Sequence, residues 1–203
     1  MQSRQLPFVA VAFLALATPA FSADFADPTW PCVQRKVERL SIGLMWPAEI
    51  PQMKLSPETG RAVDDLAELL VLRRVDPEDA RAEIATFARD QGAGLPLMGV
   101  VFRKVFDKVS QRRTRIIDGI GTFSLNQISL SGRIDSARSE METVMAAAEP
   151  DYDRADALEE QIDWDQRIYS DRQKTITYLC ETPTLLEKRL YAIAQILQEA
   201  AGS

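Results

Sequence analysis

Residues 102–144, FRKVFDKVSQRRTRIIDGIGTFSLNQISLSGRIDSARSEMETV, decide the fold. Alternate steps of four and three residues from Phe102 reach an apolar side chain nearly every time, and only Arg113 and Gln127 interrupt the series. The other members are Phe106, Val109, Ile116, Ile120, Phe123, Leu130, Ile134, Ala137, Met141 and Val144. Such a seam is typical of a long helix that packs against a second helix as in a coiled coil.

A second seam of the same kind begins at Leu158 and supplies the partner helix. Its members are Leu158, Ile162, Asp165, Tyr169, Arg172, Ile176, Leu179, Pro183, Leu186, Leu190, Ile193 and Leu197. The connection around Pro150 is short, so the two helices must be antiparallel neighbours. The sequence therefore predicts an all-α fold, in which residues 95–203 form a long antiparallel coiled-coil-like helical hairpin. At 1.5 Å per residue, each arm is about 75 Å long.

The polar members of the two seams are interpreted as devices that fix the register, since single polar residues at such positions usually do so. We expect Arg172 to face Leu130 and Asp165 to lie close to Arg138. An internal ligand site is the alternative. Pro183 is expected to kink or restart the second arm, because proline cannot continue a helical hydrogen-bond ladder.

The chain before the hairpin predicts a small base. Ser56 and Pro57 are typical of a helix start, and that helix is expected to reach about Arg74. Asp76 and Pro77 repeat the signal, so residues 57–94 are expected to form a short helical hairpin. Segment 23–56 is rich in proline and is predicted to be a docking segment of extended chain. A short helix from about Cys32 to Leu44 is expected within it.

The first 22 residues have the pattern of a secretory signal peptide. An arginine precedes an unbroken apolar stretch at 8–17, and an Ala-Phe-Ser sequence ends at Ser22. We expect cleavage after Ser22, with cleavage after Ala20 as the alternative. An uncleaved membrane anchor is the other interpretation, because the stretch is near the lower length limit for a span. The expected product is a single periplasmic helical domain, residues 23–203.

The chain has two cysteines, Cys32 and Cys180. In an oxidising compartment, such a pair without a CxxC motif indicates one structural disulfide. A bond across about 150 residues would stabilise the fold by at most about 4–5 kcal/mol in the chain-entropy model. A reactive thiol pair, or a mixed disulfide with a partner, is the alternative. It is disfavoured because the chain has no histidine to act as the base that a thiol nucleophile usually needs.

Two glycines, Gly119 and Gly121, lie opposite Cys180 in the predicted register. Each costs about 1 kcal/mol relative to alanine inside a helix, so a second segment is expected to approach closely there. We interpret the pair as the place where the segment around Trp30 docks, held by the disulfide. A kink in the helix is the alternative.

Acidic residues gather at the predicted tip of the hairpin. The candidate partner-binding residues are Asp151, Asp153, Asp156, Glu159, Glu160 and Asp163. A calcium loop of the EF-hand type that started at Asp151 would need glycine at position 156, where an aspartate stands, so we expect no metal site. The two remaining interpretations are a solvated helix end and a docking surface for a basic partner.

Segment 103–115 is the basic counterpart of the tip. Its cations are Arg103, Lys104, Lys108, Arg112, Arg113 and Arg115, against the single acid Asp107. One interpretation is contact with anionic lipid head groups or an acidic partner. The other is pairing with acids of the same protein, such as Glu187 and Glu199.

The absence of histidine excludes Ser-His-Asp and Cys-His catalysis, HExxH zinc sites and c-type haem attachment. The chain also lacks a P-loop and a GxGxxG motif, so no cofactor is expected. A formal net charge of −6 disfavours nucleic acid as a partner. Catalysis would depend on carboxylates, tyrosine or lysine on a rod without an apolar pocket, so we expect a non-enzyme.

These observations predict an exported periplasmic interaction protein, meaning an adaptor, an assembly factor or a chaperone-like clasp with an envelope protein as its partner. The alternative is a module that binds a small apolar ligand or a lipid at the base of the hairpin, beside the apolar residues 95–106. Membrane contact without a spanning segment stays open, and so does a homodimer formed through exposed faces of the hairpin.

Overall fold

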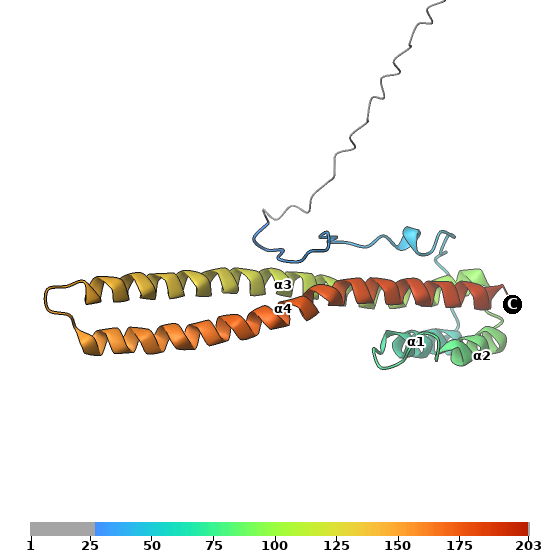
Figure 1. The fold of residues 1–203 in the computed structure, drawn as a ribbon. Helices are drawn as coiled ribbons and strands as arrows, with labels where there is room; N and C mark the ends of the chain where they lie inside the picture. The colour runs from blue at the N-terminus through green and yellow to red at the C-terminus, as the bar shows by residue number, and fades with distance from the viewer. Residues whose placement is uncertain (1–26, 203) are drawn as a thin grey trace, which may run out of the picture.

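A computed structural model describes residues 27–202 and confirms the all-α fold. The predicted signal peptide lies outside these residues. Two long helices, α3 (Leu95–Met145) and α4 (Tyr152–Ala201), run antiparallel and form a rod (Figure 1). Two shorter helices, α1 (Pro57–Val71) and α2 (Arg81–Gln91), pack against one end of the rod. Within the described part of the chain, no helix is both long enough and apolar enough to span a membrane.

The seam between α3 and α4 follows the predicted positions closely. Of the α4 seam, Leu158, Ile162, Asp165, Pro183, Leu186, Leu190, Ile193 and Leu197 are buried. On α3, Ile117 and Ser124 are buried one position beyond the expected Ile116 and Phe123, which are only half-buried. The reason is that a further segment of the chain covers a second face of α3 at this level.

The register of the hairpin differs from the predicted one. Asp165 accepts a hydrogen bond from Arg133, with 3.1 Å between Nη2 and Oδ1, whereas Arg138 pairs with Asp135. Arg172 is exposed, so its predicted position facing Leu130 is wrong. The shift arises at the tip, where helix ends at Met145 and resumes at Tyr152, so that the connection is longer than the predicted Glu149-Pro150-Asp151 break.

The base of the rod holds the largest apolar cluster. α1 buries Val63, Leu66, Ala67 and Leu70, α2 buries Ile84 and Phe87, and α4 contributes Leu190, Ile193 and Leu197. Between them lie Leu97, Met98, Val101, Phe102, Val105 and Phe106 of α3, each at most 9% exposed. The apolar surface that suggested a ligand site at the base is therefore covered by the protein's own side chains.

The two helices of the base are shorter than predicted. α1 ends at Val71 rather than near Arg74, because the Arg189 guanidinium donates to the carbonyls of Leu70 and Leu72, at 2.7 and 2.8 Å. α2 begins at Arg81. The Asp76 carboxylate caps a preceding turn by accepting from the Glu78 amide at 2.9 Å.

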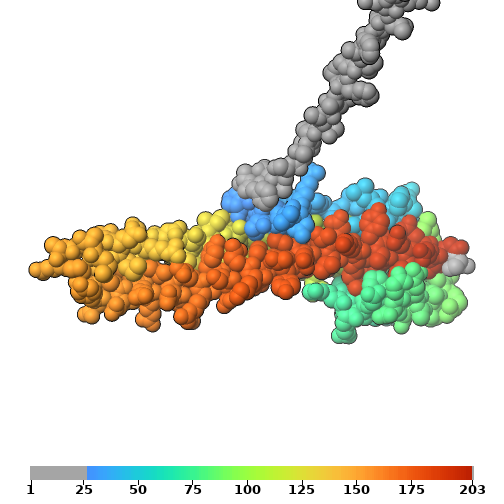
Figure 2. Space-filling view, viewed as in Figure 1, coloured from blue at the N-terminus to red at the C-terminus, as the bar shows by residue number. Residues whose placement is uncertain are grey.

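Residues 27–56, which we call the strap, run along the rod from its middle to its base (Figure 2). The helix predicted from Cys32 to Leu44 is wrong, because only the 3₁₀ turn η1 (Ile42–Leu44) forms. The strap carbonyls bind side chains instead: Trp30 Nε1 donates to Gln34 O at 2.6 Å, and Arg113 Nη1 donates to Val37 O at 2.6 Å.

The disulfide between Cys32 and Cys180 forms as predicted and joins the strap to α4, with 5.5 Å between the two Cα atoms. Trp30, Ile117 and Ile120 are buried around it. Closer to the tip, Ser124 Oγ donates to Pro28 O at 2.6 Å. The outer half of the strap is therefore held by a covalent bond, an apolar cluster and a hydrogen bond to α3.

Arg113 links the strap to both helices of the rod. Its side chain is only 4% exposed, and besides Val37 it donates through Nε to Pro183 O at 3.3 Å. Burial lowers the pKa of Arg113, and Glu187, 3.8 Å away, opposes this effect. Arg113 thus donates a hydrogen bond to the α4 backbone at Pro183, the proline within this helix. α4 does not restart at Pro183, and in Figure 1 its ribbon bends near the middle.

The two glycines that predicted the docking place differ from each other. A Cβ atom at Gly121 would lie 3.4 Å from both Cβ and O of Thr29, so the strap does pass closely there. A Cβ atom at Gly119 would meet nothing within 4 Å. The closest approach is at Gly99, where a Cβ atom would lie 3.2 Å from both Trp46 and Ile50. The prediction holds for Gly121 and is wrong for Gly119.

Replacing Gly119 and Gly121 with alanine, one at a time, should show that their environments differ. Gly119→Ala is expected to raise the free energy of unfolding by about 1 kcal/mol, the helix-propensity difference, because its methyl group enters open space. Gly121→Ala should gain less, since its methyl group would lie 3.4 Å from Thr29, at the near limit of van der Waals contact, and not in open space. Urea denaturation of both variants measures the difference, and equal gains would contradict the close contact between Thr29 and Gly121.

Candidate interaction surface

The six candidate acids lie together at the tip of the rod, in the first turns of α4 and just before it. All six are exposed, and none forms an ion pair within the described residues. Asp151 has a structural role as well, because its carboxylate accepts from the Arg154 amide at 3.0 Å and caps α4. Acidic groups at a helix N-terminus are stabilised by the helix dipole, which explains why they do not unravel it.

The one arginine among these acids does not neutralise them. Arg154 turns toward α3, and its Nη2 lies 2.5 Å from Oε1 of Glu140. Each group is about half exposed, so the contact is a surface ion pair of small energetic value. Its effect is to leave the α4 carboxylates as an uncompensated negative surface.

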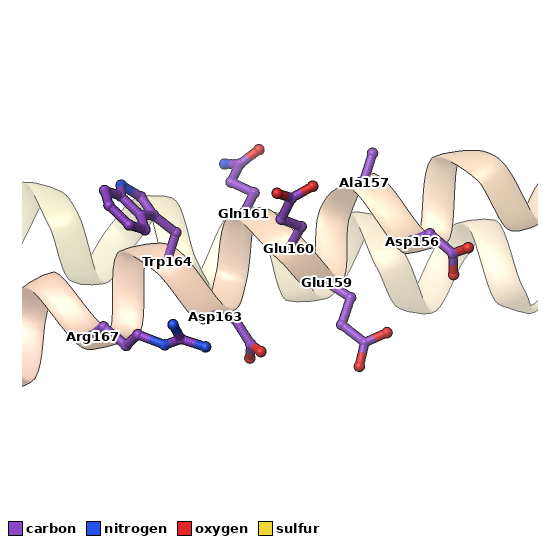
Figure 3. Close-up of a pocket in the computed structure, with 8 residues that line it drawn as sticks. All are labelled: Asp156, Ala157, Glu159, Glu160, Gln161, Asp163, Trp164 and Arg167. Atoms are coloured by element: carbon purple, nitrogen blue, oxygen red, sulfur yellow. The ribbon is translucent and has the colours of Figure 1, made fainter.

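Next to the acids, the solvent side of α4 carries a large aromatic side chain. Trp164 is 64% exposed, and Figure 3 shows it with Glu160 and Gln161, while Asp163 and Glu159 point to the other side with Arg167. The side chains in this view all come from α4, so they border an open surface. The sequence reasoning missed Trp164, although counting heptads from the seam places it on the solvent side.

The basic segment of α3 is largely occupied within the protein. Lys104 pairs with Asp64 at 2.7 Å, and Lys108 pairs with Glu68. Both acids lie on α1. Arg103 donates to Ile50 O of the strap. Of the acids expected to pair here, Glu187 contacts Arg113, but Glu199 pairs with Arg81 of α2 at 2.7 Å.

Two cations of that segment, Arg112 and Arg115, are exposed and form no ion pair among the described residues. The structure therefore separates two classes of charge. The basic segment mainly attaches α1 and the strap to the rod, whereas the tip acids face solvent and form no ion pair within the described residues.

In residues 27–202, no three side chains of the metal-binding types are grouped closely enough to hold an ion. The buried charged groups of the rod, Arg113 and Asp165, both bind other groups of the protein. Comparison with protein families, curated proteins and solved structures finds no match to this chain. Among the described residues, the tip gathers the densest set of exposed acids without an ion pair, and the solvent side of α4 beside it exposes Trp164.

Proposed function

We propose that the protein is a non-enzymatic interaction protein of the bacterial periplasm, an adaptor, assembly factor or chaperone-like clasp. In this role, the rod presents its acidic tip to a basic surface of an envelope protein. One observation carries the proposal: six carboxylates within residues 151–163 are exposed and form no ion pair with any described residue, and the side chain of the nearby arginine pairs with Glu140.

The construction of the rod supports this role. The base is a packed apolar cluster, and the strap joins it to the middle of the rod through Trp46 and the disulfide. Beyond the strap, α3 and α4 pack on each other through Leu130, Ile134, Leu158 and Ile162. An arm fixed at one end and charged at the other suits recognition at a distance from the body of the protein.

The proposed compartment rests on two observations. Residues 1–22 have the composition of a signal peptide. Cys32 and Cys180 form a buried disulfide across 148 residues, and structural disulfides persist in oxidising compartments.

Neutralising part of the tip should abolish binding to the partner. The variant Asp153→Asn/Asp156→Asn/Glu159→Gln removes three exposed charges and keeps the Asp151 cap. Immobilised protein should capture the partner from a periplasmic extract at low salt and release it as salt rises, because the attraction between exposed charges is screened. The variant should capture none of it, as measured by quantitative mass spectrometry.

A matched control removes three charges at the other end of the rod. Asp65, Glu83 and Asp90 border a groove between α1 and α2, and none forms an ion pair within the described residues. Asp65→Asn/Glu83→Gln/Asp90→Asn should bind like the unchanged protein. Equal loss in both variants would assign the effect to net charge, and capture that ignores salt would contradict the proposal.

A further inference from the structure

The solvent side of α4 carries a line of apolar side chains that nothing in the described residues covers. Trp164, Tyr178 and Leu185 are 64%, 73% and 53% exposed. They are spaced by whole heptads, so they share one face of the helix, opposite the seam. The exposed Asp171 holds the heptad position between Trp164 and Tyr178, so the apolar line is interrupted once. Exposed apolar residues that share one helix face indicate an interaction surface.

Charged residues follow the same face at heptad spacing. Glu160, Arg167, Glu181 and Lys188 lie beside the apolar line, and none of them forms an ion pair within the described residues. Lys174 holds the position between Arg167 and Glu181, so the signs along the helix are negative, positive, positive, negative and positive. Reversing the direction of the helix about Lys174 places each of the four outer charges opposite its complement and Lys174 opposite itself.

We infer that this face binds a second copy of the same chain, with the two α4 helices antiparallel and a twofold axis near Lys174. Glu160 then faces Lys188 of the second copy, and Arg167 faces Glu181. Trp164 faces Thr184, next to Leu185, whereas Tyr178 faces Ser170, next to Asp171. Both copies use the same surface, so the interface is isologous. Twofold symmetry of this kind is the commonest symmetry of protein dimers.

The charges select this register over its neighbours. A shift of one heptad in one direction places Glu160 opposite Glu181, and Arg167 opposite Lys174. A shift in the other direction places Arg167 opposite Lys188 and Lys174 opposite Glu181, so that repulsion and attraction cancel and no net gain remains. A parallel dimer in register places every charge opposite itself. Like charges that face each other are destabilising, so the antiparallel pairing about Lys174 is the arrangement that the sequence favours.

The structure also provides a place for Trp164 of the second copy. Leu185 borders a groove of about 370 Å³ between α4 and the connection from α1 to α2. The groove is also lined by the cations Arg73, Lys188 and Arg189 and by the acids Asp76 and Glu78. Among its cations, Lys188 is the one that faces Glu160 of the second copy, one turn from Trp164. A buried tryptophan in such a groove is the type of residue that contributes most of the binding energy at protein interfaces.

Because of the twofold axis, the interface has two equivalent ends, and each end pairs Trp164 of one copy with the groove of the other. Between Glu160 and Lys188 the helices run side by side for about 42 Å at 1.5 Å per residue. Near the axis, Lys174 pairs with its own Asp171 at 3.1 Å, so its positive charge is partly compensated when it meets the second Lys174. Each copy inserts one tryptophan and receives one.

Cross-linking of variants that each add one cysteine to the disulfide-bonded protein tests the register directly. In the full mature protein, Lys174→Cys should cross-link to itself with a short bismaleimide, because the two positions meet at the axis. Arg167→Cys alone and Glu181→Cys alone should not, since each lies about 21 Å from its own copy. A mixture of these two variants should cross-link. Self-linking of Arg167→Cys would indicate a parallel dimer and overturn the inference.

Sedimentation velocity then measures the strength of the dimer. Trp164→Ala removes both anchors and should raise the dissociation constant about a hundredfold or more. Leu125→Ala, a control on the exposed side of α3, should leave it unchanged. Glu160→Lys should weaken the dimer, and the charge swap Glu160→Lys/Lys188→Glu should restore it. A monomer at all concentrations, or a dimer that ignores Trp164→Ala, would overturn the inference.

This inference goes beyond the proposed function and can fail separately from it. Asp153, Asp156 and Glu159 form none of the charge pairs of the antiparallel register. The variant that neutralises them should therefore lose the basic partner and still dimerise. A protein that dimerises but captures no partner would refute the proposed function alone.

Discussion

Replacing Trp46 with alanine is expected to lower the free energy of unfolding by about 3–5 kcal/mol. Trp46 is 2% exposed and stacks on Phe102, with 5.3 Å between ring centroids. It also contacts Gly99, where α3 has no side chain to hinder its approach. The substitution would leave a cavity between the strap and the base, which the surrounding helices cannot close. Urea denaturation followed by circular dichroism measures the loss.

Two further variants make this prediction specific. Leu44 is two residues away and 75% exposed, so Leu44→Ala should change stability by less than about 0.5 kcal/mol. Trp46→Phe should cost much less than Trp46→Ala, because the buried indole nitrogen has no acceptor among the described residues and no hydrogen bond is lost. A loss below about 1 kcal/mol for Trp46→Ala would contradict the packing of the strap on α3.

Removing the disulfide should have an effect of similar size. Cys32→Ala/Cys180→Ala is expected to lower the free energy of unfolding by about 2–5 kcal/mol, since the bond closes a loop with a sequence separation of 148 residues. Guanidinium denaturation should show this loss. The folded variant should keep its helical content, because the seam of the rod does not depend on the bond.

Hydrogen exchange shows where the loss occurs. Without the bond, amides of α3 around Ile117 and Ile120 should exchange faster, because the strap covers this part of the helix. Amides near Leu130 and Leu158, in a separate apolar cluster, should be unchanged. Uniformly faster exchange along the whole rod would contradict a local role of the strap.

The long hairpin could be predicted because its signal is repeated many times. Leu190, Ile193 and Leu197, which the seam assigned to the interior, are fully buried. The disulfide followed from the presence of two cysteines. The register of the hairpin was harder to predict, because it depends on which residues form the turn at the tip. The acidic residues before Tyr152 are compatible with either helix or turn. As a result, Arg133 rather than Arg138 contacts Asp165.

The path of the strap could not be predicted, because the groups that fix it are distant in sequence. The carbonyl of Val37 accepts from Arg113, which lies 76 positions away. Local preference for a short helix was outweighed by these long-range bonds and by the burial of Trp46. Of the candidate surface, the acids were found from composition, whereas Trp164 and its antiparallel charge pattern emerge only when the solvent side of α4 is known.

The disulfide also constrains the order of events during folding. Cys180 is made 148 residues after Cys32, so the first thiol is present in the growing chain long before its partner. With two cysteines in the sequence, no intramolecular mispairing between them is available in the meantime. The native contacts of the strap have high sequence separation, which slows folding because a large loop must close first. Oxidation of this pair is therefore a late step of folding rather than an early one that guides it.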